Sequence, residues 1–443
     1  MDDLLTSYGE AIQALFARTS GNIKPGLERT EALLAKLGSP HRSLSAIHVA
    51  GTNGKGSVVA TCEALLRARG LKVGRYTSPH LVDFRERITV NGNPISEEDV
   101  LEFLQQWIPT AVDVGASFFE VTTALAFDWI AKQDVDIAVI ETGLGGRLDS
   151  TNVLVPRVAT VTSIGLDHTD LLGKTLEAIA SEKAGIYKSG TPAIVGESAP
   201  DIRNLLAKCA RDAGADPVII LDDEYAVTGV RVSTQGTAFT LAHNGTRQRI
   251  TTPLVGEHQA RNTAIAIATV TAVTGDVRAR RSSSNNPTQG VVRPPDEISG
   301  ALESVFLPGR FQREGSFIFD VAHNPAGART VATTIAVLNP SRPRIALLAV
   351  LADKDWREMI RELAPVVDCF LFTNAPSAPA DRRWEPAAAL AFAKAQGLNA
   401  DLEPDLDVAL ERIRKHEGTV LVTGSFHTVG DVMSRLQVSP FAA

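Results

Sequence analysis

The run GTNGKGS, from Gly51 to Ser57, has the composition of a loop that binds phosphate groups. Its glycines let backbone N–H groups converge on phosphate oxygens, and a helix that starts there adds a favourable dipole. In such a loop Lys55 would contact the β- and γ-phosphates of a nucleotide, and the Ser57 hydroxyl would lie near phosphate or a metal ion. A purely structural glycine turn is the alternative interpretation.

The loop differs from the common pattern GxxxxGK[ST], because Gly56 stands between Lys55 and Ser57. Ordinary GTPases and motor ATPases therefore fit the sequence poorly. A dinucleotide site fits less well still, since the segment ETGLGGRLD has Leu148 where a third glycine would stand.

Potential metal ligands follow three predicted strands directly. Ligands of doubly wound sheets bind at the carboxyl ends of the strands, so these side chains are expected at one edge. Any one of them taken alone is as well explained by a core or surface role. A histidine is an unusual ligand for Mg²⁺, which prefers oxygen, so Mn²⁺ is a potential substitute. The candidates are Ser78 and His80, Glu141, and Asp167 with His168.

Lys183 lies in a predicted helical segment, TLEAIASEKAGIYK, and has two interpretations. The simpler one is a solvated lysine. Beside divalent cations an ammonium group would be repelled, so a lysine there must lose its charge or be modified. Carbamylation by CO₂ would turn Lys183 into an oxygen ligand.

Short β-branched runs alternate with helical stretches along most of the chain, which predicts parallel sheets wrapped by helices. We expect an α/β fold with a P-loop-containing doubly wound sheet domain over residues 1–298 and a smaller Rossmann-like domain over residues 299–443. The predicted strands are Ser45–Ala50, Val73–Tyr76, Ile137–Ile140, Val158–Ile164, Ala193–Val195, Phe317–Val321, Arg344–Val350, Cys369–Thr373 and Thr419–Thr423.

Two segments of the first domain depart from this alternation. Residues 225–252 alternate apolar and polar side chains, which predicts a small antiparallel meander. The segment Val277–Glu297 is rich in polar residues, Pro and Gly, and we expect an exposed, mobile loop. Its cluster of Arg278, Arg280 and Arg281 is interpreted as a solvated charge run rather than an anion site.

Composition excludes several classes of partner. The 443 residues carry 44 Lys and Arg against 51 Asp and Glu, a net charge of −7, and no basic segment suits nucleic acid. Apolar runs such as Ile345–Ala352 are too short to span a membrane, and Asp2 and Asp3 do not suit a signal peptide. The three cysteines lack a CxxC motif, which indicates buried thiols. We expect a cytoplasmic monomer.

Eight sequence blocks follow one another along the chain: GTNGKGS, SPHL, FFEVTTALAF, ETGLGGRLDSTN, TSIGLDHTDLLGKTLEAIASEKAGIYK, GEHQARN, PGRFQ and DVAHNP. In this order they resemble the folylpolyglutamate synthase family, relatives of the Mur ligases, from about Leu27 to Ser425. Departures are the long segment 277–297 and Val321, where many members have glycine.

This resemblance implies a role for each matching residue. The loop residues Asn53, Gly54, Lys55, Gly56 and Ser57 would hold ATP, together with Asn262, Arg310 and Asp320. Two Mg²⁺ ions would be bound by Ser78, Glu141, His168 and a carbamylated Lys183. His323 and Ser425 would lie near glutamate, and Phe119 and Asp149 near the pterin. Catalysis would fall to Lys55, His168, Lys183 and His323.

The family resemblance implies ATP-dependent ligation of L-glutamate to dihydropteroate and to folates through an acyl phosphate. The segments DVAHNP and LDSTN favour both activities over folylpolyglutamate synthesis alone. A peptidoglycan ligase is disfavoured, because only about fifty residues precede Gly51. A P-loop nucleotide switch is a remaining alternative of a different class; it would hydrolyse nucleotide without stimulation by folate and glutamate.

Overall fold

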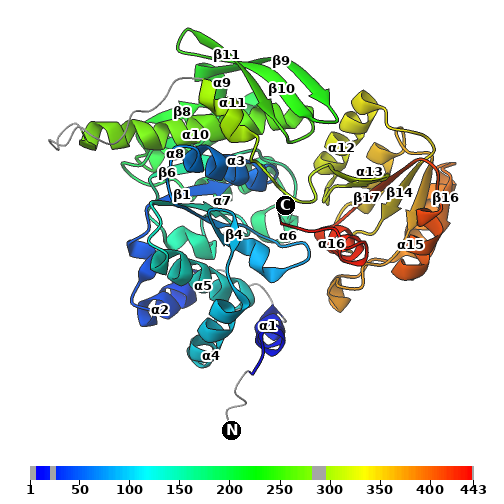
Figure 1. The fold of residues 1–443 in the computed structure, drawn as a ribbon, viewed down its shortest axis with the longest axis horizontal. Coiled ribbons are helices and arrows are strands. Elements are labelled where there is room, and N and C mark those ends of the chain that lie inside the picture. Colours follow the sequence, from blue (N-terminus) through cyan, green and yellow to red (C-terminus); the bar gives the residue numbers. More distant parts are fainter. Residues whose placement is uncertain (1–5, 20–25, 282–295, 442–443) are drawn as a thin grey trace.

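The structure is a computed structural model that describes residues 6–19, 26–281 and 296–441 (Figure 1). Its described strands form an eight-stranded sheet, a three-stranded sheet and a six-stranded sheet. We call the part built on the first two sheets the larger lobe and the part built on the six-stranded sheet the smaller lobe. Figure 1 shows the two lobes side by side, with the smaller lobe coloured yellow to red.

The eight-stranded sheet has the order β4-β3-β2-β5-β1-β6-β7-β8. Strand β1 lies between β5 and β6, pairs with both in parallel, and is buried along its whole length, as expected for a central strand. Strand β3 pairs in the antiparallel sense with both β2 and β4, and the other described pairs of this sheet are parallel. The strands are β1 (Ala46–Ala50), β2 (Val73–Tyr76), β3 (Ile88–Val90), β4 (Asn93–Pro94), β5 (Ile137–Glu141), β6 (Val158–Val161), β7 (Ala193–Val195) and β8 (Val218–Ile220).

Helices cover both faces of this sheet. Ile47 and Val49 of β1 face a core shared with α3 and α10, whereas Ala46 faces a core shared with α1, α2, α4 and α5. The helices are α1 (Tyr8–Phe16), α2 (Glu28–Lys36), α3 (Lys55–Arg67), α4 (Glu97–Asp113), α5 (Phe118–Lys132), α6 (Thr169–Leu172), α7 (Leu176–Ala184), α8 (Pro200–Asp212), α9 (Leu221–Glu224), α10 (Glu257–Arg281) and α11 (Asp296–Leu302). Short 3-10 turns are η1 (Ala17–Thr19), η2 (Pro40–Arg42), η3 (Phe84–Arg87) and η4 (Ser150–Val153).

The predicted meander is present. Strands β9 (Tyr225–Ser233), β10 (Gly236–His243) and β11 (Thr246–Thr252) form an antiparallel sheet that packs on α10.

The smaller lobe is a second doubly wound sheet with the order β12-β13-β17-β14-β15-β16, in which only β12 is antiparallel. Helices α12, α13 and α14 cover one face, and α15 and α16 cover the other. Its elements are β12 (Gln312–Glu314), β13 (Phe317–Phe319), α12 (Pro325–Leu338), β14 (Arg344–Leu348), α13 (Trp356–Leu363), β15 (Cys369–Phe372), η5 (Ala380–Arg382), α14 (Pro386–Ala395), β16 (Ala400–Leu402), α15 (Leu406–Arg414), β17 (Thr419–Thr423) and α16 (Phe426–Arg435).

The predicted fold class, a P-loop-containing doubly wound sheet with a smaller α/β domain, is confirmed. The loop predicted over Val277–Glu297 is wrong at both ends: α10 continues through Arg281, and α11 begins at Asp296. Arg and Ala favour helix, and one glycine at Gly275 costs only about 1 kcal/mol. The rest of that prediction, residues 282–295, lies outside the described residues, and the boundary at residue 298 falls within α11. None of the described helices has the length and apolar content to cross a bilayer.

Candidate functional site

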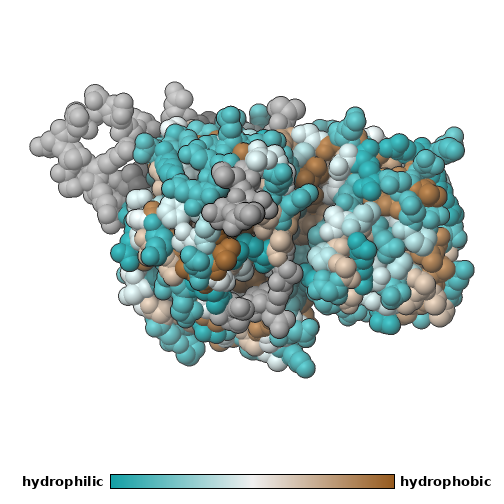
Figure 2. Space-filling view, turned by 90° about the horizontal axis from the view of Figure 1, so that it is seen from below, coloured by the Kyte–Doolittle hydropathy of each residue, from teal (hydrophilic) through white to brown (hydrophobic). Residues whose placement is uncertain are grey.

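A cavity of about 870 Å³ opens between the two lobes and is lined by residues of both. Figure 2 shows the surface hollowed at this junction. Of the candidate metal ligands, Asp167 lines the cavity but His80 does not; His80 Nδ1 accepts a hydrogen bond from Arg87 Nε at 2.7 Å. The cavity brings together all the residues to which the family resemblance assigns a role. They are Asn53, Gly54, Lys55, Gly56, Ser57, Ser78, Phe119, Glu141, Asp149, His168, Lys183, Asn262, Arg310, Asp320, His323 and Ser425.

The phosphate loop joins β1 to α3. Gly54 caps α3 with a φ of 86°, and a side chain there would collide with Asn262, because a Cβ would lie 2.6 Å from its Oδ1. The Lys55 ammonium donates to the backbone oxygens of Gly51 (3.1 Å) and Thr52 (3.2 Å). Lys55 is therefore held over the loop at the N-terminus of α3, where anions are stabilised.

Thr52 ties this loop to the segment that follows β6. Its backbone N–H donates to Ser163 O at 2.6 Å, and its hydroxyl exchanges hydrogen bonds with the N–H (3.0 Å) and carbonyl oxygen (3.1 Å) of Gly165. Because Asp167 and His168 lie in that segment, Thr52 fixes them relative to the phosphate loop.

Glu141 ends β5 and is only 4% exposed. Burial raises the pKa of its carboxyl, and the charges of Lys55 and Arg310 and a hydrogen bond from the Ser78 N–H oppose the rise. Within the described ranges, no other side chain forms a hydrogen bond or an ion pair with this carboxyl. A buried carboxylate in this state is suited to bind a cation.

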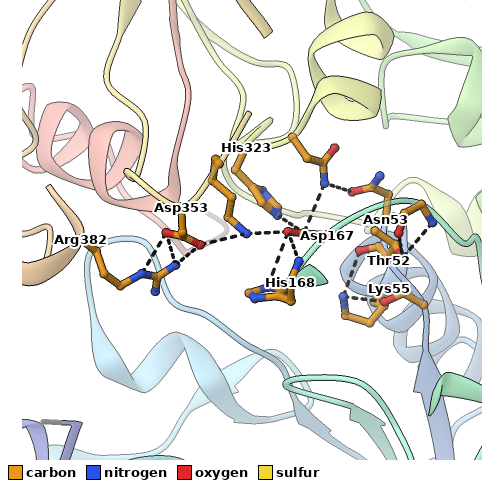
Figure 3. A network of polar contacts seen from close by, with 12 residues as sticks. Thr52, Asn53, Lys55, Asp167, His168, His323, Asp353 and Arg382 are labelled. Carbon is orange, nitrogen blue, oxygen red and sulfur yellow. Dashed lines mark hydrogen bonds and ion pairs between the residues drawn. The ribbon is translucent and has the colours of Figure 1, made fainter. Parts of the chain in front are cut away.

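Asp167 joins the two lobes (Figure 3). One of its carboxylate oxygens lies 2.5 Å from Lys354 Nζ, and the other lies 3.3 Å from His323 Nε2 and 3.4 Å from Asn324 Nδ2. Burial alone would raise the pKa of Asp167, but the hydrogen bond and charge of His323, with His168 and Lys354, hold it far below its usual range. Asp167 is therefore an anion at the centre of the cavity.

His168 follows Asp167 in a left-handed backbone conformation, with a φ of 50°. Burial lowers the pKa of His168 to about 4, although the charge of Asp167 opposes the shift. At neutral pH its imidazole is uncharged, the form that binds metals.

Lys183 lies in the last turn of α7 and is 5% exposed, so the interpretation as a solvated lysine is wrong. Burial, followed by the charge of Lys55, lowers the pKa of Lys183 to about 7, against opposing contributions from Asp167 and Asp149. At neutral pH a large fraction of the protein molecules therefore has Lys183 as a neutral amine, and only a neutral amine reacts with CO₂.

Asp320 of the smaller lobe directly follows β13, Ser425 closely follows the end of β17, and Arg310 precedes β12. Asp320 accepts hydrogen bonds from the N–H groups of Phe311 and Ala322, both at 2.9 Å, and burial raises the pKa of its carboxyl. Arg310 lies over the Phe426 ring at 5.1 Å. Ser425 caps α16 by accepting from Thr428 N at 3.0 Å.

Asp149 and Phe119 line the cavity from the larger lobe. Asp149 Oδ1 accepts from Thr151 N (3.0 Å) and Thr151 Oγ1 (2.5 Å), and Oδ2 accepts from Leu144 N (2.7 Å). The Phe119 ring packs beside Gly143, where a side chain would collide with it.

Sequence reasoning missed Lys354 and Arg382, which also line the cavity. Arg382 pairs with Asp353 at 2.9 Å, and Asp353 lies 3.7 Å from Lys354 (Figure 3). Asp353 and Lys354 closely follow β14, so the rule that ligands gather at the carboxyl ends of parallel strands could have identified them.

Comparison with known proteins gives two family matches that cover both lobes. The family model of the Mur ligase middle domain matches residues 49–270. The family model of the glutamate ligase domain of Mur ligases matches residues 309–426. The dihydrofolate synthase/folylpolyglutamate synthase of Escherichia coli is 37% identical over 97% of this chain and 94% of its own length. That of Bacillus subtilis is 32% identical over 98% of this chain and 100% of its own length.

Solved structures give the same result. Folylpolyglutamate synthase of Mycobacterium tuberculosis complexed with ADP has a TM-score of 0.87 at 33% identity, covering 99% of this chain and 100% of that chain. Escherichia coli FolC in complex with DHPP and ADP has a TM-score of 0.83 at 31% identity, covering 99% of each chain. The chain therefore belongs to the dihydrofolate synthase/folylpolyglutamate synthase family of Mur-type ligases, ATP-dependent enzymes that form carbon–nitrogen bonds.

Proposed function

We propose that the protein ligates L-glutamate both to dihydropteroate and to tetrahydrofolate or its polyglutamates, with cleavage of ATP and through an acyl phosphate. The observation that carries this proposal is one cavity between the lobes. It is lined by the phosphate loop and buried ionisable groups of the larger lobe, and by Arg310, Asp320, His323 and Ser425 of the smaller lobe. Relatives that carry both activities in their names span nearly the full chain.

ATP is needed because a carboxylate resists attack by an amine. Transfer of the γ-phosphoryl group to the pterin substrate's carboxylate forms an acyl phosphate, and ADP leaves. Lys55 and the N–H groups at the start of α3 stabilise the negative charge of the phosphates. Asn262, Arg310 and Asp320 are proposed to hold ATP in the cavity that both lobes line.

We propose that two Mg²⁺ ions, for which Mn²⁺ can substitute, bind to Ser78, Glu141, His168 and a carbamylated Lys183. The buried carboxylate of Glu141 and the low pKa of Lys183 support this donor set. Among the described residues no group of three His, Cys, Asp or Glu side chains could hold a metal ion, and the proposed donor set includes a hydroxyl and a modified lysine instead. A structure of a bifunctional relative has Mn, AMPPNP and L-glutamate bound. Bound metal would neutralise charge on the nucleotide phosphates.

The second step joins glutamate to the activated carbonyl. The glutamate α-amine attacks the acyl phosphate, a tetrahedral intermediate forms, and inorganic phosphate leaves as the amide bond is completed. His323 and Ser425 of the smaller lobe are proposed to hold glutamate, while Phe119 and Asp149 hold the pterin end. Closure of the two lobes excludes water, which would otherwise hydrolyse the acyl phosphate.

We also propose that the protein is cytoplasmic. We propose that it is a monomer, since one chain supplies all of these residues. Gel filtration with light scattering would test the oligomeric state: a mass near 47.2 kDa is expected, and twice that mass would contradict the proposal.

The function is tested by incubating the purified protein with ATP, Mg²⁺ and L-glutamate, and with either dihydropteroate or tetrahydrofolate. We expect a glutamylated product with each pterin. Product from tetrahydrofolate alone would contradict bifunctionality and leave a folylpolyglutamate synthase. ATP hydrolysis that neither pterin nor glutamate stimulates would indicate a nucleotide switch.

A further inference from the structure

His48 lies in the middle of β1, the strand that leads into the phosphate loop, and its side chain is completely buried at 0% exposed. A histidine in the core of a central strand is costly unless its polar atoms are paired. Burial lowers the pKa of His48 to about 3, so its imidazole is neutral and carries one proton.

The position of that proton follows from the partners. His48 Nε2 lies 2.8 Å from Thr151 Oγ1, which lies 2.5 Å from Asp149 Oδ1. Burial raises the pKa of Asp149, but the N–H groups of Leu144 and Thr151 oppose the rise by donating to its two oxygens, which keeps both oxygens acceptors. A hydroxyl has one hydrogen, so Thr151 Oγ1 donates it to Asp149 Oδ1. Thr151 Oγ1 must therefore accept from an Nε2–H of His48. His48 Nδ1 is the unprotonated nitrogen, and it has no partner in the described part of the chain.

This chain of hydrogen bonds ends on a carboxylate that lines the cavity. The other hydrogen bonds to Asp149 described above come from backbone N–H groups, of Leu144 and Thr151. The Thr151 hydroxyl is able to rotate, and the Nε2–H of His48 leaves it one orientation, in which its hydrogen points at Asp149 Oδ1.

We propose that His48 is a positioning residue for the pterin substrate: through Thr151 it fixes the carboxylate of Asp149 at the pterin end of the cavity. The inference rests on the proposed function, in which Asp149 meets the pterin. It also links Asp149 to β1, whose C-terminal end leads into the phosphate loop.

A pair of variants tests the role of the Nε2–H group. Leucine at this position fills the core without a donor, whereas the amide nitrogen of glutamine can take the place of Nε2. For His48→Leu we expect the KM for dihydropteroate to rise about fivefold to tenfold, the effect of losing one hydrogen bond, while the KM for ATP stays within twofold. His48→Gln is expected to restore most of the loss.

A mere packing defect in β1 would change the KM for ATP as much as that for dihydropteroate, and glutamine would not repair it. Either result would overturn the proposal. Wild-type protein in the same assay separates this failure from failure of the proposed function: without wild-type turnover the function itself is wrong, and the inference falls with it.

If His48→Leu does not fold, two variants of Thr151 test the hydrogen-bond chain instead. Thr151→Val keeps the shape of the side chain and the N–H bond to Asp149 but removes the hydroxyl, and Thr151→Ser keeps the hydroxyl. The same selective rise in the KM for dihydropteroate is expected for Thr151→Val, and a value within twofold of wild type for Thr151→Ser. Equal KM values for the two variants would contradict the hydrogen-bond chain.

Discussion

Three ionisable side chains give the cavity its chemistry at the scale of single residues. Lys55 is held over the phosphate loop, Glu141 is a buried carboxylate that lacks a side-chain partner among the described residues, and Lys183 has an amine whose pKa lies near 7. Their residue types and strand-end positions were predictable from the sequence. The burial of Lys183 was not, because the helix around it has no strong apolar periodicity to show which face is covered.

We expect Lys55→Ala and Glu141→Ala each to lower ATP-dependent glutamate ligation at least about 100-fold, because each removes a group that stabilises or organises phosphate charge. Circular dichroism and the thermal midpoint should show a folded protein. Lys394→Ala, at an exposed position of α14, is the matched control and should be as active as wild type. Turnover within tenfold of wild type in either site variant would contradict the assignment.

The low pKa of Lys183 predicts a pH-dependent stability. Between a folded pKa of about 7 and an unfolded pKa of about 10.4, the unfolded chain binds more protons, so stability rises with pH. Lys183→Met lacks this contribution. Its stability relative to wild type should therefore fall by about 1 kcal/mol per pH unit between pH 7.5 and 9.

Thermal unfolding of both proteins in buffer free of CO₂ would measure this difference. Buffer free of CO₂ keeps the amine unmodified. A difference that does not change with pH would show that Lys183 has an ordinary pKa.

At the scale of elements, the longer strands of the eight-stranded and six-stranded sheets were predictable, because their apolar, β-branched runs are buried on both faces. Strands β3, β4, β8, β12 and β16 were not predicted. Each has only two or three residues, over which no period can be seen, and of the strands that short only β7 and β13 were predicted. The extension of α10 through Arg281 was also missed, because a polar run without apolar periodicity does not distinguish an exposed helix from a loop.

Thr52 connects two elements whose relative position the chemistry requires, the phosphate loop and the segment after β6. Thr52→Val removes the hydroxyl that bonds to both backbone groups of Gly165. We expect kcat/KM to fall about tenfold, since losing a hydrogen bond costs about 1 kcal/mol and the His168 segment would shift.

Thr52→Ser retains the hydroxyl and should remain close to wild type in steady-state assays. A Thr52→Val enzyme as active as Thr52→Ser would show that the loop and the segment hold their positions without this bond.

At the scale of the whole molecule, Asp167 joins the lobes through Lys354, His323 and Asn324. The motifs of each lobe could be read from the sequence separately. The pairing of Asp167 with Lys354 could not, because it depends on how two lobes meet, which no local pattern records.

Lys354 and Asp167 have side chains only 7% and 8% exposed, so removing the Lys354 charge leaves Asp167 buried with only His323 and Asn324 as partners from the smaller lobe. We expect Lys354→Met to open the lobes of the ligand-free protein, which lets water reach Asp167. Small-angle X-ray scattering should give a larger radius of gyration than for wild type. Arg329→Met, which breaks an exposed ion pair with Glu362 inside the smaller lobe, should not change it, and an unchanged value for Lys354→Met would contradict the role of this pair.

The central claim is that ATP activates the carboxylate of the pterin substrate before glutamate attacks it. The most direct test uses dihydropteroate labelled with ¹⁸O in its carboxylate, together with ATP, Mg²⁺ and L-glutamate, and mass spectrometry of the phosphate released. An acyl phosphate predicts one ¹⁸O atom in each inorganic phosphate that accompanies ligation. Ligation that releases only unlabelled phosphate would contradict the account.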